Sequence, residues 1–213
     1  MKVHQTSNHG RRRRSVLNLA DFLARSAANG PGIRAVVWVQ GCPIHCKGCF
    51  NPVFWSFSPA TMVSSDEIAG RILAIKDIDG VTFSGGEPFF QAEALASVGE
   101  QVQKAGRTVV TYTGYTYEQL TSGTDPAWNR LLGVTDLLIA GPYIRTLACD
   151  DPYIGSSNQQ LISLTGRVRT DAPHGQAHGE IIEFSIAPGG MVTTTGFPRE
   201  HTVRQIAVRC RGE

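Results

Sequence analysis

Three of the five cysteines in this chain of 213 residues fall within the stretch GCPIHCKGCF. Cys42, Cys46 and Cys49 follow directly after the apolar run AVVWVQ, whose short length and β-branched residues predict a buried strand. Cysteines this close together rarely bridge for structural reasons, and the other two, Cys149 and Cys210, stand alone. The pattern therefore predicts a metal site in a reducing compartment, and we expect a cytoplasmic protein.

The Cys-x3-Cys-x2-Cys spacing narrows the kind of metal site. A structural zinc ion takes four ligands, usually from two separated pairs, and the sequence has no distant Cys-x2-Cys partner. His45 lies between two of the cysteines, where tetrahedral closure would be strained. Three thiolates on a cubic [4Fe-4S] cluster leave one iron open, as a catalytic site requires. We therefore expect a [4Fe-4S] cluster, with zinc or free thiols as the alternatives.

Two more distinctive loops follow predicted strands. SGGEP ends the strand at 81–84, and TGY closes the strand at 108–115. In parallel α/β folds the carboxyl ends of the strands share one face and build the active site. Gly85 and Gly86 would let the backbone approach a ligand, and Glu87 or nearby carbonyls would accept hydrogen bonds from an amine. A plain strand-to-helix turn, with Pro88 near the helix start, would suit the same residues.

Strands and helices alternate in the part of the chain that must position these loops. The expected strands are 35–40, 81–84 and 108–115, and residues 135–143 are expected to form one more strand and a turn. The expected helices are 64–77, with Ser64 or Ser65 as its N-cap, 92–106, and one short helix within 117–132. This alternation is typical of parallel βα units, and we expect an α/β fold.

The pattern changes after about residue 160. Residues 180–198 predict two strands around the turn Pro188-Gly189-Gly190, and residues 202–209 predict a third. His174 and His178 lie in a Gly-rich polar segment, which favours a solvated loop over a metal pair. We expect a flexible basic arm at 1–15, a core at 16–162 and a C-terminal β extension at 163–213.

Net charge and hydrophobicity argue against nucleic acid and membranes as partners. The net charge of +2 argues against a dedicated nucleic-acid binder. No apolar run approaches the ~20 residues that cross a bilayer, so we expect no membrane span. The basic run Arg11 to Arg14 is followed by a segment that Asn18, Asp21 and Arg25 interrupt, which is not the pattern of an export signal.

CPIHCKGCFN resembles the signature of the radical S-adenosylmethionine (SAM) superfamily. The wider chain resembles one branch of it, the anaerobic ribonucleotide reductase activating proteins and related glycyl-radical activases. The matching pieces run in order: NGPGIR (29–34), VQGCPIHCKGCFNP (39–52), FSGGEP (83–88), YTGY (112–115), LLIAGPY (137–143) and GSSNQ (155–159). The resemblance implies a partial (β/α)6 barrel with a small C-terminal antiparallel β appendage.

The resemblance also implies the cofactors and the site. The open iron would bind SAM, whose reductive cleavage gives a 5′-deoxyadenosyl radical that abstracts hydrogen. Cys42, Cys46 and Cys49 would be the catalytic and metal-binding residues. The SAM pocket would comprise Gly48, Cys49, Phe50, Asn51, Ser84, Gly85, Gly86, Glu87, Thr113, Gly114, Tyr115 and Asn158. Within it Phe50 would lie beside the adenine, and TGY would reach the ribose or the methionyl carboxylate.

The implied function is to install a glycyl radical on a partner enzyme such as anaerobic ribonucleotide reductase, with flavodoxin or ferredoxin as electron donor. A radical SAM enzyme that modifies a peptide or metabolite held by the C-terminal extension is one alternative. A non-enzymatic iron–sulfur or zinc module is another. Arg34 would meet either an anionic group or its own loop. Family members often carry an acid where this chain has Ala140, and Asp136 opens the same strand.

Overall fold

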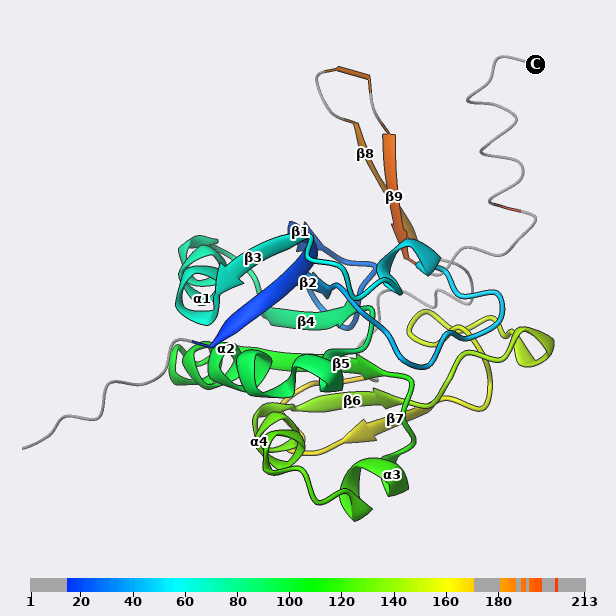
Figure 1. Cartoon of the computed structure of the whole chain (residues 1–213). Helices are drawn as coiled ribbons and strands as arrows, with labels where there is room; N and C mark the ends of the chain where they lie inside the picture. Colours follow the sequence, from blue (N-terminus) through cyan, green and yellow to red (C-terminus); the bar gives the residue numbers. More distant parts are fainter. Residues whose placement is uncertain (1–14, 171–180, 187–188, 191, 197–201, 203–213) are drawn as a thin grey trace, which may run out of the picture.

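A mixed sheet carries the site loops in the computed structural model, which describes residues 15–170, 181–186, 189–190, 192–196 and 202. In these ranges the sheet has seven strands in the order β3-β1-β2-β4-β5-β6-β7 (Figure 1). The strands are β1 Val16–Ser26, β2 Arg34–Val39, β3 Thr61–Ser64, β4 Gly80–Gly85, β5 Thr108–Thr113, β6 Leu137–Ala140 and β7 Gln160–Ser163.

The four central strands, β2, β4, β5 and β6, run parallel, as the alternation of strand and helix predicted. All six residues of β2 are buried, because covered parallel strands bury both of their faces. The expected α/β class is confirmed. The sheet runs open from β3 to β7, and its outer strands pair antiparallel.

Helices cover one face of the sheet. The elements are α1 Ser65–Ala74, α2 Ala92–Lys104, α3 Tyr117–Ser122 and α4 Pro126–Val134, with short 3-10 turns η1 Pro52–Phe54, η2 Pro88–Gln91 and η3 Arg145–Leu147. Ser64 caps α1 by accepting a hydrogen bond from the amide of Glu67, as predicted. The single short helix expected within 117–132 is wrong: two helices form there. The chain leaves α3 at Gly123, and Asp125 caps a new helix that starts at Pro126.

Apolar side chains of α1, α2 and α4 build the main core with the helix-facing side of the strands. Its largest buried members include Phe83, Ile72, Leu95 and Leu131. A smaller cluster on the other side of the sheet joins Val110, Tyr112, Leu137, Ile139 and Val168. Residues 164–168 thus remain packed on the main sheet beyond β7.

Three outer strands were not predicted. β1 carries Asn18, Asp21 and Arg25, and its pairing with β2 contains register irregularities, so no simple alternation marks it. β3 and β7 are only four residues long. The strand and turn expected within 135–143 both form: β6 ends at Ala140, Gly141 turns with φ of 117° and Pro142 follows. Pairing with the adjacent strands, and not the local sequence pattern, makes the three outer segments extended.

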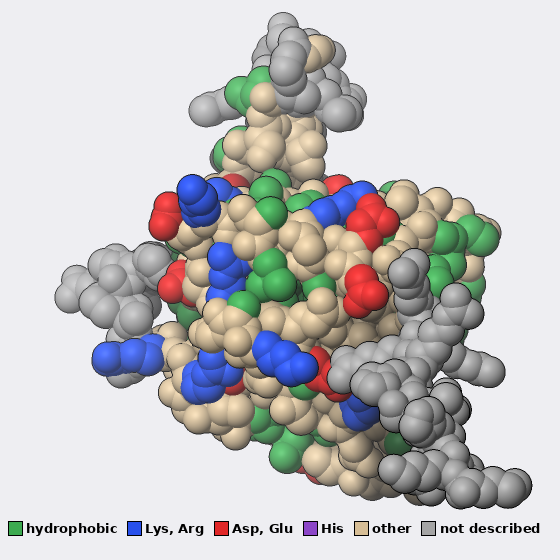
Figure 2. All heavy atoms as spheres, turned by 90° about the vertical axis from the view of Figure 1, so that its left-hand side faces the viewer, with side chains coloured by type: hydrophobic (Ala, Val, Ile, Leu, Met, Phe, Trp, Pro, Cys, Tyr) green, Lys and Arg blue, Asp and Glu red, His purple; other side chains and the backbone are tan. Residues whose placement is uncertain are grey.

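A separate two-stranded antiparallel sheet pairs β8 Ile182–Ile186 with β9 Val192–Gly196, as expected for this region. It projects from the main body (Figures 1 and 2). Glu183 accepts hydrogen bonds from the Ser26 hydroxyl and, at 2.8 Å, from the Ala27 amide. Asn29 donates to the Thr195 hydroxyl at 2.9 Å. The hairpin therefore attaches where β1 turns into β2.

Several expectations concern residues outside the described ranges. These are the arm up to residue 14, Pro188 of the expected turn, His174, His178, Cys210 and all of the third strand at 202–209 except Thr202. No helix in the described part of the chain has the length and hydropathy that crossing a bilayer requires. On the face shown in Figure 2, basic and acidic side chains are interspersed.

Candidate active site

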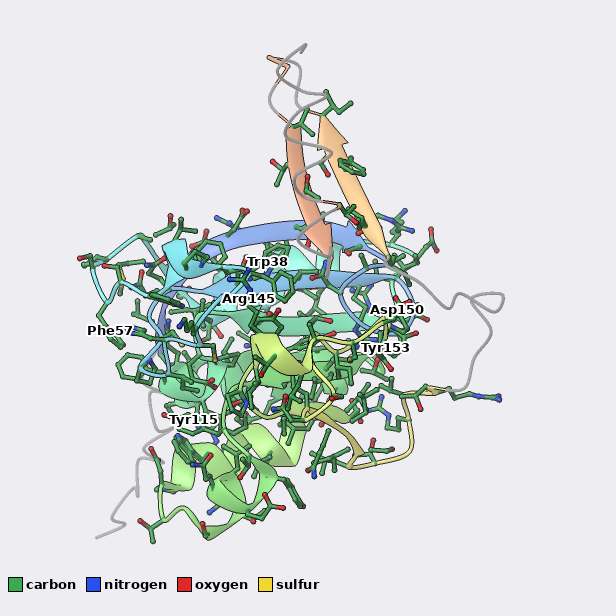
Figure 3. The ribbon with its side chains drawn as sticks, turned by 90° about the vertical axis from the view of Figure 1, so that its right-hand side faces the viewer. Trp38, Phe57, Tyr115, Arg145, Asp150 and Tyr153 are labelled. Carbon is green, nitrogen blue, oxygen red and sulfur yellow. The ribbon has the colours of Figure 1, made fainter. Side chains whose placement is uncertain are left out.

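The three distinctive loops meet at one cavity of about 110 Å³, at the carboxyl ends of the parallel strands. In Figure 3, Phe57 and Tyr115 lie on one side of the view, and Asp150 and Tyr153 on the other. The cavity is lined by Cys42, Ile44, Cys46, Cys49, Trp55, Ser84, Gly85, Gly86, Glu87, Pro88, Tyr112, Thr113, Gly114, Gly141, Tyr143 and Gln159. The cysteine, SGGEP and TGY loops, distant in sequence, therefore share one site.

Backbone hydrogen bonds close the cysteine loop at its base. The amide of Gly41 donates to the Phe54 carbonyl at 2.8 Å, and the amide of Cys42 donates to the Trp55 carbonyl at 3.1 Å. Gly41 has φ of 98°, which favours glycine, and the Phe57 ring packs where its Cβ would be. Residues 42–54 are thus held as a loop above the end of β2.

The three thiols are partly or fully buried. Burial raises the pKa of Cys42 and of Cys46, and the neighbouring Cys49 raises that of Cys46 further. Backbone hydrogen bonding from His45 and Tyr143 partly opposes this rise by lowering the pKa of Cys42 and of Cys46, respectively. In the described ranges, no three His, Cys, Asp or Glu side chains are arranged to hold a single metal ion.

The two glycines of SGGEP allow close backbone packing. A Cβ on Gly85 would lie 2.4 Å from the Val39 nitrogen, and one on Gly86 would lie 2.2 Å from the Gly41 oxygen. Gly85 also has φ of 107°. The amide of Glu87 donates to the Gly41 carbonyl at 2.8 Å. These glycines therefore join the SGGEP loop to the base of the cysteine loop.

Glu87 joins the SGGEP loop to the TGY loop. Its buried carboxylate accepts hydrogen bonds from the Phe89 amide at 2.9 Å, the Thr113 hydroxyl at 2.8 Å and the Gly114 amide at 2.9 Å. Burial nevertheless raises its pKa to about 7, because these donors only partly offset the lost hydration. Both oxygens of Glu87 thus already have partners within the chain, which the sequence did not indicate.

The other residues expected to bind SAM are placed differently. Phe50 lies beside the cavity, with its ring centroid 5.1 Å from that of Tyr143. The Tyr115 ring packs against Trp128, 4.8 Å between centroids, and does not line the cavity. Asn158 is also outside the lining and donates to the Pro142 carbonyl at 2.8 Å.

Gly48 and Asn51 belong to the cysteine loop but do not line the cavity. Gly48 has φ of 85°, and a Cβ there would meet the Arg145 side chain at 3.2 Å. The amide of Asn51 lies 3.4 Å from the Cys49 sulfur, as a loop-closing residue would. These two residues shape the loop around Cys49.

The sequence did not single out several lining residues, namely Ile44, Trp55, Tyr112, Gly141, Tyr143 and Gln159. Gln159 accepts a hydrogen bond from the Gly155 amide at 2.9 Å and donates to the Gly141 carbonyl at 3.1 Å. The motifs LLIAGPY and GSSNQ already contained Gly141, Tyr143 and Gln159. A signal was therefore present, but the role of each side chain depended on the loop paths.

Arg34 and Asp136 stabilise the framework of the sheet and do not line the cavity. Arg34 is buried at the amino end of β2 and donates to carbonyls of Pro31, Val81 and Thr108, so it meets its own loop and strand neighbours. Burial lowers its pKa to about 10. Asp136 is buried and accepts from the Val109 amide at 2.8 Å.

Comparison with known proteins agrees with this site. The sequence model of the "4Fe-4S single cluster domain" family matches residues 28–162. The chain belongs to this family. An anaerobic ribonucleoside-triphosphate reductase-activating protein of Vibrio cholerae is 32% identical over 162 residues, which cover 70% of this chain and 99% of the relative. That of Haemophilus influenzae is 32% identical over 155 residues, 67% of this chain and 96% of the relative.

A pyruvate formate-lyase-activating enzyme of Clostridium pasteurianum is 35% identical over 106 residues, which cover 46% of this chain and 44% of the relative. This 4Fe-4S single cluster protein is a radical SAM enzyme of the glycyl-radical activase type, with a [4Fe-4S] cluster and SAM as cofactors. The residues present fit them, because three thiols, the donors of iron–sulfur clusters, line one cavity and would serve three of the four irons of a [4Fe-4S] cluster.

Proposed function

We propose that this chain installs a glycyl radical on a partner enzyme, with an anaerobic ribonucleotide reductase as the first candidate. The observation that carries the proposal is the meeting of Cys42, Cys46 and Cys49 with the SGGEP and TGY loops around one cavity. When bound, the reduced cluster supplies the electron that cleaves SAM. The named functions of the relatives from Vibrio cholerae and Haemophilus influenzae support the choice of partner.

Each loop has a part in this function. The three cysteines hold the cluster. Glu87 keeps the SGGEP and TGY loops at a fixed separation, and the cavity wall from Ser84 to Gly86, together with Thr113 and Gly114, contacts SAM. The remaining proposed contacts, Gly48, Phe50, Asn51, Tyr115 and Asn158, form the surrounding rim.

The open sheet corresponds, in this proposal, to a partial (β/α)6 barrel. Residues 16–162 carry the chemistry, and 163–213 form an extension whose first residues still pack on the core. An open barrel suits a substrate as large as a protein loop. A cytoplasmic flavodoxin or ferredoxin supplies the electron.

Modification of a peptide or metabolite held by the C-terminal extension is less well supported. The described hairpin of that extension attaches through Glu183 and Thr195 to residues 26–29, beside the amino end of β2. The cavity lies at the carboxyl ends of the parallel strands. The hairpin base is therefore at the opposite end of the sheet from the site.

The test uses anaerobically reconstituted full-length protein. Reduction in the presence of SAM should yield 5′-deoxyadenosine and methionine, and Cys42→Ala, Cys46→Ala and Cys49→Ala should each abolish the yield. Cys149→Ala, at a half-buried cysteine outside the cavity, is the matched control and should retain it. Equal activity in all four variants would refute the assignment. Mixing with a candidate reductase should then give a glycyl radical by electron paramagnetic resonance; cleavage without it would point to another substrate.

A further inference from the structure

We infer that the indole N–H of Trp55 donates a hydrogen bond to a sulfur atom of the cluster and thereby raises the reduction potential of the cluster. The inference rests on the proposed function in that it requires the cluster at Cys42, Cys46 and Cys49. It adds a residue that places a hydrogen-bond donor near the cluster and controls how readily the cluster accepts an electron.

The first observation is a buried donor without a partner. Trp55 Nε1 is shielded from solvent and has no hydrogen-bond partner within the described residues. Leaving a buried donor unpaired costs about 1–3 kcal/mol, so native structures rarely do so without a reason. Because indole can only donate, the missing partner must be an acceptor.

The second observation is the position of Trp55. Trp55 is one of the residues that line the same cavity as the three thiols. The ring stacks on His45, with 4.8 Å between centroids and an interplanar angle of 22°, and His45 lies between Cys42 and Cys46 in the loop. The indole is therefore placed next to the segment that carries two of the cluster ligands.

The third observation is that this ring is held in place. The Trp55 carbonyl accepts from the Cys42 amide at 3.1 Å, and its own amide closes the η1 turn on Pro52 at 3.3 Å. These bonds hold the backbone of Trp55, and stacking on His45 restricts its ring. The donor is thus preorganised before the cofactor arrives, which makes it effective in a site of low polarity.

Glu87, a charged acceptor that lines the cavity, already accepts from Phe89, Thr113 and Gly114. The bound cofactors supply two acceptor types, cluster sulfur and SAM oxygen. The stacking on His45 favours sulfur, since it ties the ring to the ligand loop. Hydrogen bonds to cluster sulfurs stabilise the reduced, more negative form, so the donor raises the potential.

The test compares Trp55→Phe with Trp128→Phe. Phenylalanine keeps an aromatic ring that can stack on His45, and it removes the indole N–H together with the five-membered part of the ring. Trp128 is the matched control, because its indole N–H already donates to the Phe89 carbonyl at 3.0 Å and it does not line the cavity. Iron and sulfide content and the midpoint potential without SAM are measured by an anaerobic redox titration followed by electron paramagnetic resonance. SAM binding is measured separately.

We expect full cluster content in both variants and a midpoint shifted to more negative potential in Trp55→Phe alone. An unchanged midpoint with full cluster content would overturn the inference. An unchanged midpoint with weaker SAM binding would overturn it in favour of a bond to SAM. If the wild type itself holds no cluster, the proposed function fails instead.

If Trp55→Phe does not load a cluster, the wild type with nitrogen-15 tryptophan replaces it. Electron–nuclear double resonance of the reduced cluster should then show a coupled indole nitrogen that persists in Trp128→Phe. Absence of that coupling would overturn the inference.

Discussion

Replacement of Glu87 by glutamine should remove a pH dependence from the stability of the protein. Burial raises the pKa of this carboxyl group from its ordinary value of 4.5 to about 7. Between these pH values the folded chain binds a proton that the unfolded chain has released. The stabilisation from Glu87 is therefore fully present below about pH 4.5 and is lost as the pH rises through 7.

The size of the effect follows from the two pKa values. At about 1.4 kcal/mol per pKa unit, the free energy of unfolding should fall by about 3 kcal/mol across this window because of Glu87 alone. Glu87→Gln cannot titrate. Relative to that variant, the wild type should lose about this amount of stability as the pH rises from 4.5 to 7, and subtraction cancels the other titrating groups.

The assay is denaturant unfolding of the cofactor-free protein, followed by tryptophan fluorescence under reducing conditions at several pH values. Glu67→Gln, at an exposed ion pair with Arg71 on α1, controls for exchange of a carboxylate for an amide. Parallel stability curves for the wild type and Glu87→Gln would refute the reasoning. They would mean that the three donors, not burial, dominate the ionisation of Glu87.

Three other substitutions test the framework by the same unfolding assay. Gly86→Ala places a Cβ 2.2 Å from the Gly41 oxygen and should lower the free energy of unfolding by about 3 kcal/mol. Gly70→Ala on α1, where a Cβ meets open space, is the control and should not destabilise the protein. Equal effects of the two substitutions would contradict the packing argument. Asp136→Ala removes the acceptor of buried donors and should cost about 3 kcal/mol, a value near zero being the contrary result. Ser64→Ala removes the cap of α1 and should cost about 1 kcal/mol; no loss would show the cap to be dispensable.

Much of the parallel centre was predictable because its signals are local. Short β-branched runs gave β2, β4 and β5, and Ser64 marked the start of α1. The outer strands were not predictable in this way. β1 has polar residues within it and pairs irregularly with β2, so only the neighbouring strand determines that it is extended.

The same distinction between local signals and tertiary contacts holds for the site. The spacing of Cys42, Cys46 and Cys49 indicated the chemistry, because thiolate number and spacing are covalent features of the chain. The spacing did not show that the carboxylate of Glu87 would accept hydrogen bonds from Thr113 and Gly114, which are distant in sequence.

By itself, then, the sequence predicted the ligand set and determined the parallel strands and the loops that follow them, since these depend on residue type and short-range pattern. Only the tertiary structure decided which side chains face the cavity, how Glu87 ties two loops together and that Trp55 holds an unpaired donor beside the thiols. Those features arise where segments far apart in the chain pack together. Burial and hydrogen-bond pairing are therefore settled by the fold as a whole.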